Sequence, residues 1–377
     1  MQKISVYVNQ IKNFKITRKI VIQIFLVLLL SMIFSLVYFN LTTISLYLHN
    51  FGSIYNSRLQ LYSIYVGQGD SSFIILPNKT SILIDTGTEE YAEKFCDELE
   101  SVMDANSLEK IDYMFLTHPH SDHIGGALKV FEQFEVVNIF RPIICSPLEE
   151  NLQGYDVSDD FLYIEVLERA EQEGNVEFIL PKEINVDDYT LKIWTPLSTN
   201  YSDLNDYSPI ITIQNAENSL MFTGDLTIDG EAEFLNTYKD IEIDVDVLKV
   251  AHHGSENATS AEFLEKVNPE IAIISAGVDN IYNFPNDQLM QRLNDSGVNK
   301  ILSTNMAGTI GMSVSGDVYN FATGFIFHDR VVFVVIYFIL LFAIFSVKKN
   351  GTLKKVERIR AGSNLIVSKK NFWNILS

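Results

Sequence analysis

Cysteine is almost absent from this chain of 377 residues, which contains only Cys96 and Cys145. Two cysteines far apart in sequence cannot make the disulfide framework by which small secreted domains replace a large core. We therefore expect two free, buried thiols. An apolar content of 47% excludes wholesale disorder and indicates that the chain buries a sizeable core.

Basic side chains are also scarce, with 28 Lys and Arg against 48 Asp and Glu and a net charge of −20. This balance argues against a general nucleic-acid-coating protein, which would normally carry a basic face. The shortage of basic side chains is not spread evenly along the chain. Residues 1–20 carry five basic side chains and no acid, and residues 348–377 carry eight and one acid, so removing +5 and +7 leaves −32 for the residues between. The chain reads as an acidic body with two basic ends.

Two long uncharged runs lie beside these ends, the 20 residues Ile20–Phe39 and the 17 residues Val331–Val347. Both are long enough to cross a hydrocarbon core of about 30 Å as helices, the second only just. The positive-inside rule places both basic ends in the cytoplasm and the body on the outer side of the cell membrane. A cleaved signal peptide is the alternative for the first run. We expect an uncleaved anchor, because no small-x-small site follows Tyr38.

Internal repeats and low-complexity tracts are absent, which excludes solenoids and fibrous proteins. The body alternates short β-rich runs with amphipathic helical patterns, for example a helix over Ile124–Phe134 and a hairpin joining Ile210–Gln214 to Ser219–Thr223. Consecutive strands mixed with strand–helix units predict a layered α/β sandwich rather than a doubly wound sheet.

Five of the seven histidines fall in two short clusters within the body. His118, His120 and His123 share a loop with Asp122, directly after the apolar run IDYMFL. Imidazoles and a carboxylate gathered on one tight loop form an N/O ligand set that suits zinc and is possible for manganese or iron. The loop therefore predicts a metal site.

Two further segments end strands with ligand-type side chains. Asp225 closes the strand in FTGD, and a carboxylate can bridge two cations where one imidazole nitrogen cannot. His252 and His253 follow the apolar run VDVLKV. Either histidine could supply a metal ligand or a general acid for a leaving group.

These segments resemble the metallo-β-lactamase superfamily, and within it the hydrolase domain of ComEC-type competence proteins. The resemblance covers about Leu61 to Phe321, without the many-helix channel of a full ComEC protein. It rests on motifs that occur in the same order: YVGQGDS (Tyr65–Ser71), LIDTG (Leu83–Gly87), LTHPHSDHIGG (Leu116–Gly126), FTGD (Phe222–Asp225), LKVAHHGS (Leu248–Ser255) and STNMAGTIGMSVSG (Ser303–Gly316).

The resemblance implies a four-layer αββα sandwich over residues 61–321. Transmembrane helices at 20–39 and 331–347 and cytoplasmic tails at 1–19 and 348–377 complete the expected domain plan. The resemblance also implies one or two metal ions, zinc by preference and manganese as an alternative, that activate water and stabilise developing charge. The implied site roles are His118 and His120 on a first metal, Asp122 and His123 on a second, Asp225 between them, His253 or His252 near the leaving group, and Asp85 as a carboxylate that orients the loop.

Two departures from the superfamily pattern affect the metal shells. The segment Ile124–Gly224 contains no histidine, and Phe284 stands where many members carry a late histidine before a proline. Each metal could therefore lack one protein ligand. Water, His252, Asn286 or a carboxylate could complete the shells, or one metal alone could bind tightly.

The resemblance implies hydrolysis of phosphodiesters, for example of single-stranded DNA during DNA uptake. The charge of −32 opposes a polyanionic substrate unless the metals supply the attraction, because the body's basic residues are scattered. Hydrolysis of a cell-envelope phosphoester such as phosphorylcholine is an alternative, and a non-catalytic metal-binding module at the membrane is another. Among the possible substrates, β-lactams rank third, after phosphodiesters and cell-envelope phosphoesters. The sequence identifies no protein partner.

Overall fold

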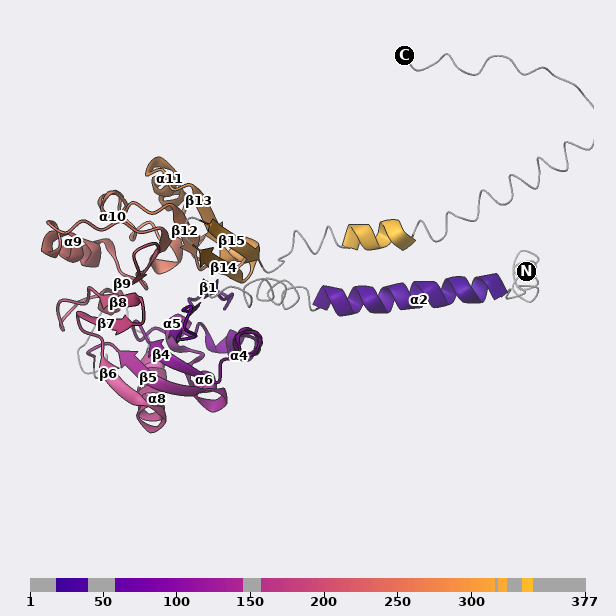
Figure 1. Cartoon of the computed structure of the whole chain (residues 1–377), viewed down its shortest axis with the longest axis horizontal. Coiled ribbons are helices and arrows are strands. Elements are labelled where there is room, and N and C mark those ends of the chain that lie inside the picture. Colours follow the sequence, from indigo (N-terminus) through magenta and orange to yellow (C-terminus); the bar gives the residue numbers. More distant parts are fainter. Residues whose placement is uncertain (1–17, 40–57, 145–156, 316–317, 324–333, 342–377) are drawn as a thin grey trace, which may run out of the picture. The chain divides into compact units, whose positions relative to one another are not determined.

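The computed structural model describes residues 18–39, 58–144, 157–315, 318–323 and 334–341. The chain divides into two units, one formed by residues 1–39 and 327–377 and the other by residues 40–326. Figure 1 labels the helices and strands. Each unit is described separately below.

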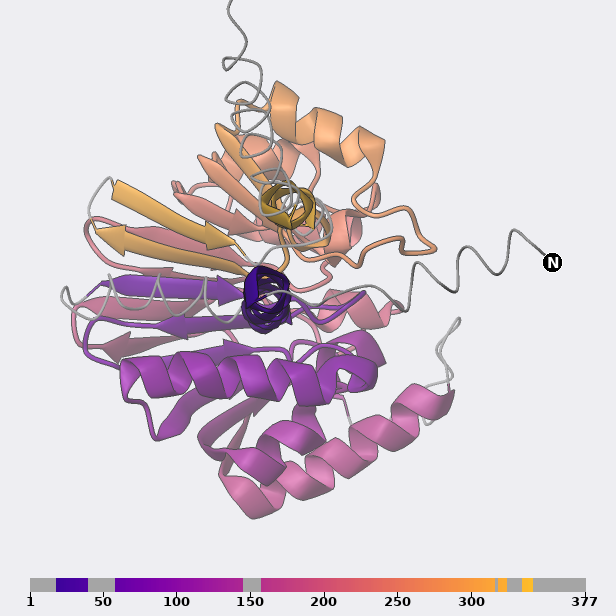
Figure 2. The ribbon, with the colours of Figure 1, turned by 90° about the vertical axis from the view of Figure 1, so that its right-hand side faces the viewer.

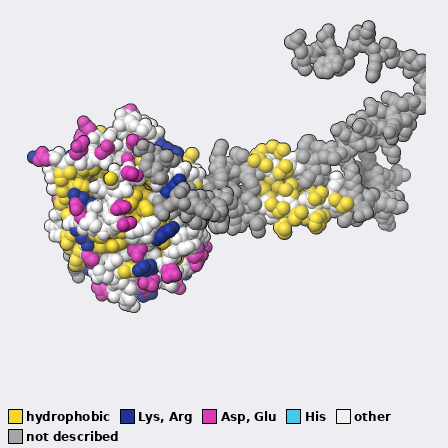
Figure 3. All heavy atoms as spheres, viewed as in Figure 1, with side chains coloured by type: hydrophobic (Ala, Val, Ile, Leu, Met, Phe, Trp, Pro, Cys, Tyr) yellow, Lys and Arg dark blue, Asp and Glu magenta, His cyan; other side chains and the backbone are white. Residues whose placement is uncertain are grey.

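The first unit contains the helix α2 (Arg18–Phe39) and a helical segment at residues 334–341. The hydroxyls of Ser31 and Tyr337 lie 2.5 Å apart, and the rings of Phe34 and Tyr337 are 4.3 Å apart between centroids. Many of the apolar side chains described on α2 are exposed (Figure 3). Within the described residues, no helix combines the length and the apolar character that crossing a membrane requires.

The second unit is built on two sheets. One has the strand order β15-β14-β1-β2-β3-β4-β5-β6, and the other has the order β13-β12-β11-β10-β9-β8-β7. Strands β3 to β6 are parallel to one another, as are β10 to β13, and the remaining pairs are antiparallel. The strands are β1 (Leu59–Ser63), β2 (Ser72–Ile75), β3 (Ser81–Ile84), β4 (Lys110–Phe115), β5 (Glu135–Arg141), β6 (Asn175–Phe178), β7 (Lys182–Val186), β8 (Tyr189–Ile193), β9 (Ile211–Gln214), β10 (Ser219–Phe222), β11 (Val247–Lys249), β12 (Ile271–Ile274), β13 (Lys300–Ser303), β14 (Ile310–Ser315) and β15 (Val318–Thr323).

Helices cover the outer face of each sheet, which makes four layers (Figure 2). The first sheet packs against α4 (Ala92–Asn106), α6 (Ala127–Gln133) and α8 (Val157–Glu173), and the second against α9 (Ile228–Thr237), α10 (Ala261–Val267) and α11 (Asp287–Asp295). Shorter elements are η1 (Glu89–Tyr91), α5 (Ser121–Ile124), η2 (Leu204–Tyr207), η3 (His252–Gly254) and α12 (Thr304–Ala307). The α/β sandwich predicted from the sequence is confirmed.

Three apolar cores separate the four layers. Neighbouring residues of a strand point to opposite faces, so Leu61 enters the core between the sheets while Tyr62 packs against the first helical layer. In β10, Leu220 and Met221 divide in the same way between the central core and the second helical layer. Because both faces are covered, the inner strands are apolar on both sides, which is why they appear as continuous apolar runs in the sequence.

Two local expectations from the sequence are tested by the structure. The hairpin is confirmed, because β9 and β10 pair antiparallel and Asn215 closes the turn to Asn218. The helix expected over Ile124–Phe134 is confirmed as α6, which begins three residues later, at Ala127. A separate short helix, α5, precedes Gly125 and Gly126. The two glycines leave α5 free to hold part of the histidine loop at the end of β4.

The carboxylate of Glu231 fixes the start of α10, and it provides a pH-dependent test of this packing. Glu231 accepts hydrogen bonds from the backbone N–H groups of Thr259 and Ser260. Burial raises the pKa of Glu231 to about 7, although those hydrogen bonds oppose the rise. A carboxyl group whose pKa is higher in the folded state contributes stability at low pH, and that contribution is lost as the pH rises towards 7.

Between pH 5 and pH 8 we therefore expect the native protein to lose up to about 3 kcal/mol of unfolding free energy through this group. The Glu231→Gln variant should lack this component of the slope, because an amide does not titrate. Urea unfolding of both proteins across this pH range measures the difference. Parallel stability curves for the two proteins would contradict the assignment.

Candidate metal centre

The chemically reactive side chains gather where parallel strands of both sheets end. Asp85 follows β3, the histidine loop follows β4, and Asp225 follows β10. His252 and His253 follow β11 in the same way. Because loops at the carboxyl ends of parallel strands meet at one edge, residues far apart in sequence come together there.

Asp85 is the buried anchor of the histidine loop. Its Oδ1 accepts the backbone N–H of Thr117 at 2.8 Å, and its Oδ2 accepts the Thr117 hydroxyl at 2.7 Å. The same Oδ2 lies 2.7 Å from His123 Nδ1. In this contact the Nδ1–H of His123 donates to the carboxylate, which turns Nε2 towards the centre of the cluster.

His253 is oriented by an equivalent contact on the opposite sheet. Its Nδ1 lies 3.1 Å from the backbone carbonyl of Ser275, which can only accept, so Nδ1 is the donor. Its Nε2 then faces Asp122 Oδ2 at 3.1 Å and Asp225 Oδ2 at 3.3 Å. Both His252 and His253 have positive φ, +49° and +54°, an uncommon conformation for residues with a Cβ. Such strained backbone is concentrated at functional sites.

Asp122, His123, Asp225 and His253 form the centre of the cluster, with one potential ligand atom of each within 4.8 Å of the others. The Nε2 atoms of His123 and His253 lie 3.4 Å apart. Asp225 Oδ1 is buried and has no hydrogen-bond partner, although it is 3.1 Å from His123 Nε2. Two imidazole nitrogens and two carboxylates that converge with an unsatisfied oxygen are the donor set that a divalent cation such as zinc takes. The residues present therefore fit a metal.

The protonation of this cluster points the same way. Burial disfavours a charged His123, but Asp225 and Asp85 outweigh it and raise the pKa of His123 well above its usual range. Burial also opposes a charged His253, yet Asp225 and Asp122 raise the pKa of His253 to about 10. In this cluster, charged carboxylates therefore lie beside two protonated imidazoles. A bound cation can replace those protons, because metal binding releases protons from its ligands.

His118 and His120, expected on the first metal, lie together beside this cluster. His118 Nε2 is 3.0 Å from His120 Nδ1, and the rings of His118 and His123 are 4.2 Å apart. Burial lowers the pKa of His118 well below its usual range, which keeps it in the neutral form that ligates metals. His118 Nδ1 also lies 3.1 Å from the Thr117 hydroxyl.

His252 occupies the rim of the site. Its Nε2 is 3.8 Å from Asp225 Oδ2, and its buried Nδ1 has no hydrogen-bond partner. The ring of Phe284 lies 6.0 Å from the His252 ring. Phe284 thus places an aromatic ring beside His252. Asn286, considered as a replacement ligand, instead caps α11 by accepting the Gln288 N–H at 2.8 Å.

Three supporting residues were not predicted from the sequence. Lys249 Nζ lies 2.5 Å from Asp70 Oδ2, and both side chains are almost fully buried. The Ser275 hydroxyl donates to Asp70 Oδ1 at 2.9 Å, while the Ser275 carbonyl holds His253. Asp70 and Lys249 stand in two of the motifs noted above, but only the fold brings those motifs into contact.

Two glycines allow the close approaches that the site needs. A Cβ on Gly69 would lie 2.4 Å from the backbone oxygen of Asp122, so only glycine fits there. Gly224 has φ +49°, and a Cβ on it would meet the Ser208 side chain at 2.8 Å. The Ser208 hydroxyl accepts the Asp225 N–H at 3.1 Å. These contacts fix the backbone of both metal-site aspartates.

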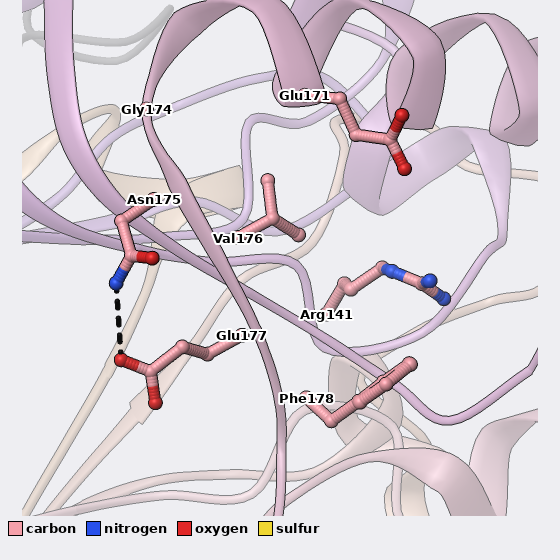
Figure 4. A pocket seen from close by; sticks show the side chains of 7 residues that line it. All are labelled: Arg141, Glu171, Gly174, Asn175, Val176, Glu177 and Phe178. Carbon is pink, nitrogen blue, oxygen red and sulfur yellow. Dashed lines mark hydrogen bonds between the residues drawn. The ribbon is translucent and has the colours of Figure 1, made fainter.

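A hollow of about 330 Å³ lies elsewhere, at the edge formed by β5 and β6 (Figure 4). Arg141 stacks over Phe178 there, with 4.5 Å to the ring centroid, and Glu171 and Glu177 line the same hollow. None of the histidines contributes to its wall. The chemistry therefore concentrates at the histidine cluster and not in this hollow.

Cys96 is a free, buried thiol, as predicted, and burial raises its pKa to about 12. A thiol with so high a pKa is unreactive at neutral pH, because the thiolate is the nucleophile. Cys145 lies outside the described residues.

The fold and the histidine cluster define a metal-dependent hydrolase of the α/β sandwich type. The chain belongs to the metallo-beta-lactamase superfamily, whose family model matches residues 64–278. The expected family is thereby confirmed.

Among curated proteins, the chain is 30% identical over 272 residues to ComE operon protein 3 of Bacillus subtilis, covering 68% of this chain and 33% of that protein. It is 28% identical over 247 residues to Competence protein ComA of Neisseria gonorrhoeae, covering 65% of this chain and 30% of that protein. The chain thus spans about a third of the length of these relatives. A solved metal-dependent hydrolase of the β-lactamase superfamily is 14% identical with a TM-score of 0.43, covering 68% of this chain and 99% of that one.

Proposed function

We propose that this protein is a membrane-anchored, metal-dependent phosphodiesterase that cleaves single-stranded DNA during DNA uptake. The observation that carries the proposal is the convergence of Asp122, His123, Asp225 and His253, with ligand atoms of all four within 4.8 Å of one another. One of the relatives is named as a competence protein, and the DNA substrate is this proposal's own extension from that name and from the resemblance noted in the sequence.

In the proposed reaction, Asp122, His123, Asp225 and His253 would hold the metal, with His118 and His120 beside them. A bound divalent cation would supply Lewis acidity and lower the pKa of water at the site. Asp85 and the Ser275 carbonyl fix the histidine tautomers, so that both Nε2 atoms face the centre of the cluster. His252, on the rim and partly exposed, is placed to pass a proton to the departing oxygen.

The acidic charge of the body favours a substrate bound through the metal centre. Figure 3 shows Lys and Arg scattered among Asp and Glu on the face in view, without a basic groove there. A polyanion gains little from such a surface, so its phosphate must be attracted by cations at the site itself. Zinc is the first choice of ion because the ligands are imidazole and carboxylate, and manganese is the alternative.

The anchoring part of the proposal rests on the sequence and on α2. The uncharged run Ile20–Phe39 and the exposed apolar side chains of α2, Phe25, Leu28 and Met32 among them, would be costly in water. The basic ends would face the cytoplasm and the hydrolase domain the outside of the cell membrane. Cysteine-accessibility labelling of intact cells, with cysteines placed in residues 1–19 and in an exposed loop of the body, tests this topology.

A substrate panel with the purified full-length protein tests the activity. We expect zinc- or manganese-dependent degradation of single-stranded DNA and hydrolysis of bis-p-nitrophenyl phosphate, both abolished by EDTA and restored by metal. Cleavage of p-nitrophenylphosphorylcholine without cleavage of DNA would replace the proposal with a cell-envelope phosphoesterase. No turnover at all, with metal bound, would indicate a non-catalytic metal-binding module.

A further inference from the structure

An aromatic pair, Tyr282 and Phe284, stands beside the metal centre, on the loop formed by residues 277–286. Tyr282 is 58% exposed, Phe284 is half-buried against the second helical layer, and their rings stack with 5.5 Å between centroids and 18° between planes. Ile281, the neighbouring apolar side chain, is 86% exposed. Phe284 in turn contacts the ring of His252, whose Nε2 faces Asp225. The pair is therefore continuous with the metal site through one side chain.

The loop is held in a fixed shape. The Asn280 side chain donates to the carbonyls of Gly277 and Phe284 at 2.9 Å and 2.7 Å and accepts the Phe284 N–H at 2.9 Å. The backbone N–H of Asn286 donates to the carbonyl of Gly254 at 2.8 Å, which ties the loop to the histidine turn. The aromatic pair is thus presented by a preorganised loop, which lowers the entropic cost of binding.

A second aromatic group borders the same loop. The Tyr65 hydroxyl accepts the Val278 N–H at 3.3 Å, and the rings of Tyr65 and Tyr91 meet edge to face at 5.5 Å. Lys94 Nζ lies 5.5 Å from the Tyr65 ring centroid and also 4.0 Å from Glu98. Aromatic rings therefore lie beside the start of the 277–286 loop as well as on it, and a cation lies beside one of them.

We propose that Tyr282 and Phe284 form a stacking platform for an unpaired nucleobase next to the phosphate that the metal centre cleaves. Stacking on aromatic faces accepts every base, because every base has a π face, and this part of the attraction does not depend on the charge of the body. It therefore accounts for how so acidic a body could hold single-stranded nucleic acid. The inference rests on the proposed function and names its substrate-binding subsite.

The occupant follows from the chemistry of the loop and its position. A lipid or protein surface would contact mainly Ile281, the most exposed apolar side chain of the loop. A nucleobase would instead contact the rings of Tyr282 and Phe284. The acids Asp279 and Asp287 at either end of the loop also oppose insertion into an anionic membrane surface. The contact of Phe284 with His252 places the rings within reach of a nucleotide whose phosphate is at the metal.

Fluorescence anisotropy of the zinc-loaded, full-length protein tests the platform at low salt, with a labelled dT12 oligonucleotide and a matching abasic 12-mer that both carry hydrolysis-resistant phosphorothioate linkages. We expect Tyr282→Ala and Phe284→Leu to weaken dT12 binding about 5- to 100-fold, and Tyr282→Trp to retain it. Ile281→Ala, the matched control on the same loop, should bind as the native protein does. The abasic 12-mer should bind weakly and be insensitive to all four substitutions.

Equal binding of dT12 and the abasic oligonucleotide would overturn the inference, as would an Ile281→Ala effect as large as that of Tyr282→Ala. Hydrolysis of bis-p-nitrophenyl phosphate by the native protein separates this result from the proposed function. Base-dependent binding without any phosphodiester hydrolysis would support the stacking platform and reject the proposed activity. Hydrolysis without base-dependent binding would support the activity and reject the platform.

Discussion

Replacing Asp225 by Asn is expected to lower kcat/KM for bis-p-nitrophenyl phosphate by at least about a thousandfold, because several kcal/mol of charge stabilisation depend on the bound metal. Burial works against a charged Asp225, but His123, His253 and His252 outweigh it and lower its pKa well below the usual range. The buried carboxylate therefore carries its charge in the folded protein. An amide of the same shape removes that charge and leaves one oxygen for the metal.

Elemental analysis of zinc in the same preparations should show less metal in the Asp225→Asn variant than in the native protein. Asp240→Asn is the matched control, because it makes the same chemical change at an exposed position. Full activity of the Asp225→Asn variant would reject the metal centre as described. Loss of activity in both variants would point to a general effect of purification.

Replacing Lys249 by Met is expected to destabilise the protein by about 3–5 kcal/mol, since it leaves a buried carboxylate without its partner. Lys249 and Asp70 are 2.5 Å apart with side chains only 3% and 6% exposed. Lys249 also donates to the carbonyl of Val250 at 3.0 Å. Few substitutions outside the apolar cores should cost as much, and urea unfolding of the full-length protein measures the change.

The double variant Lys249→Met with Asp70→Leu should recover most of this loss, because two apolar side chains replace a buried ion pair without leaving a charge behind. Additive losses in the double variant would show that the pair is not coupled. Lys94→Met is the control for removing a lysine, because Lys94 is more than half exposed and faces Glu98 at 4.0 Å. That substitution should cost less than about 1 kcal/mol.

The buried pair and the metal centre are connected, which explains why the otherwise apolar strand β11 ends on a lysine, Lys249. Asp70 accepts the Ser275 hydroxyl, and the Ser275 carbonyl orients His253. The backbone N–H of Asp70 also donates to the carbonyl of Asp122 at 3.1 Å. Loss of Lys249 should therefore loosen two of the proposed ligands as well as destabilise the fold.

Much of the fold could be predicted because its determinants are local. Apolar strand runs are continuous where both faces are buried, as at Val247–Lys249, and turn residues mark where they end. The histidine loop could be recognised for the same reason, since His118, His120, Asp122 and His123 lie within six positions. The short helix α5, which carries Asp122 and His123, was not predicted, because four residues are too few to show helical periodicity.

By itself, the sequence determined the layered α/β class, the family and the residue types of a metal centre, together with the acidic charge that any substrate must overcome. Only the tertiary structure decided which residues meet. His123 and His253, 130 positions apart, face each other because strands of two different sheets end at one edge. Phe284 lies beside His252 and pairs with Tyr282 there. Such contacts depend on long-range packing of the two sheets, which no local pattern of residues encodes.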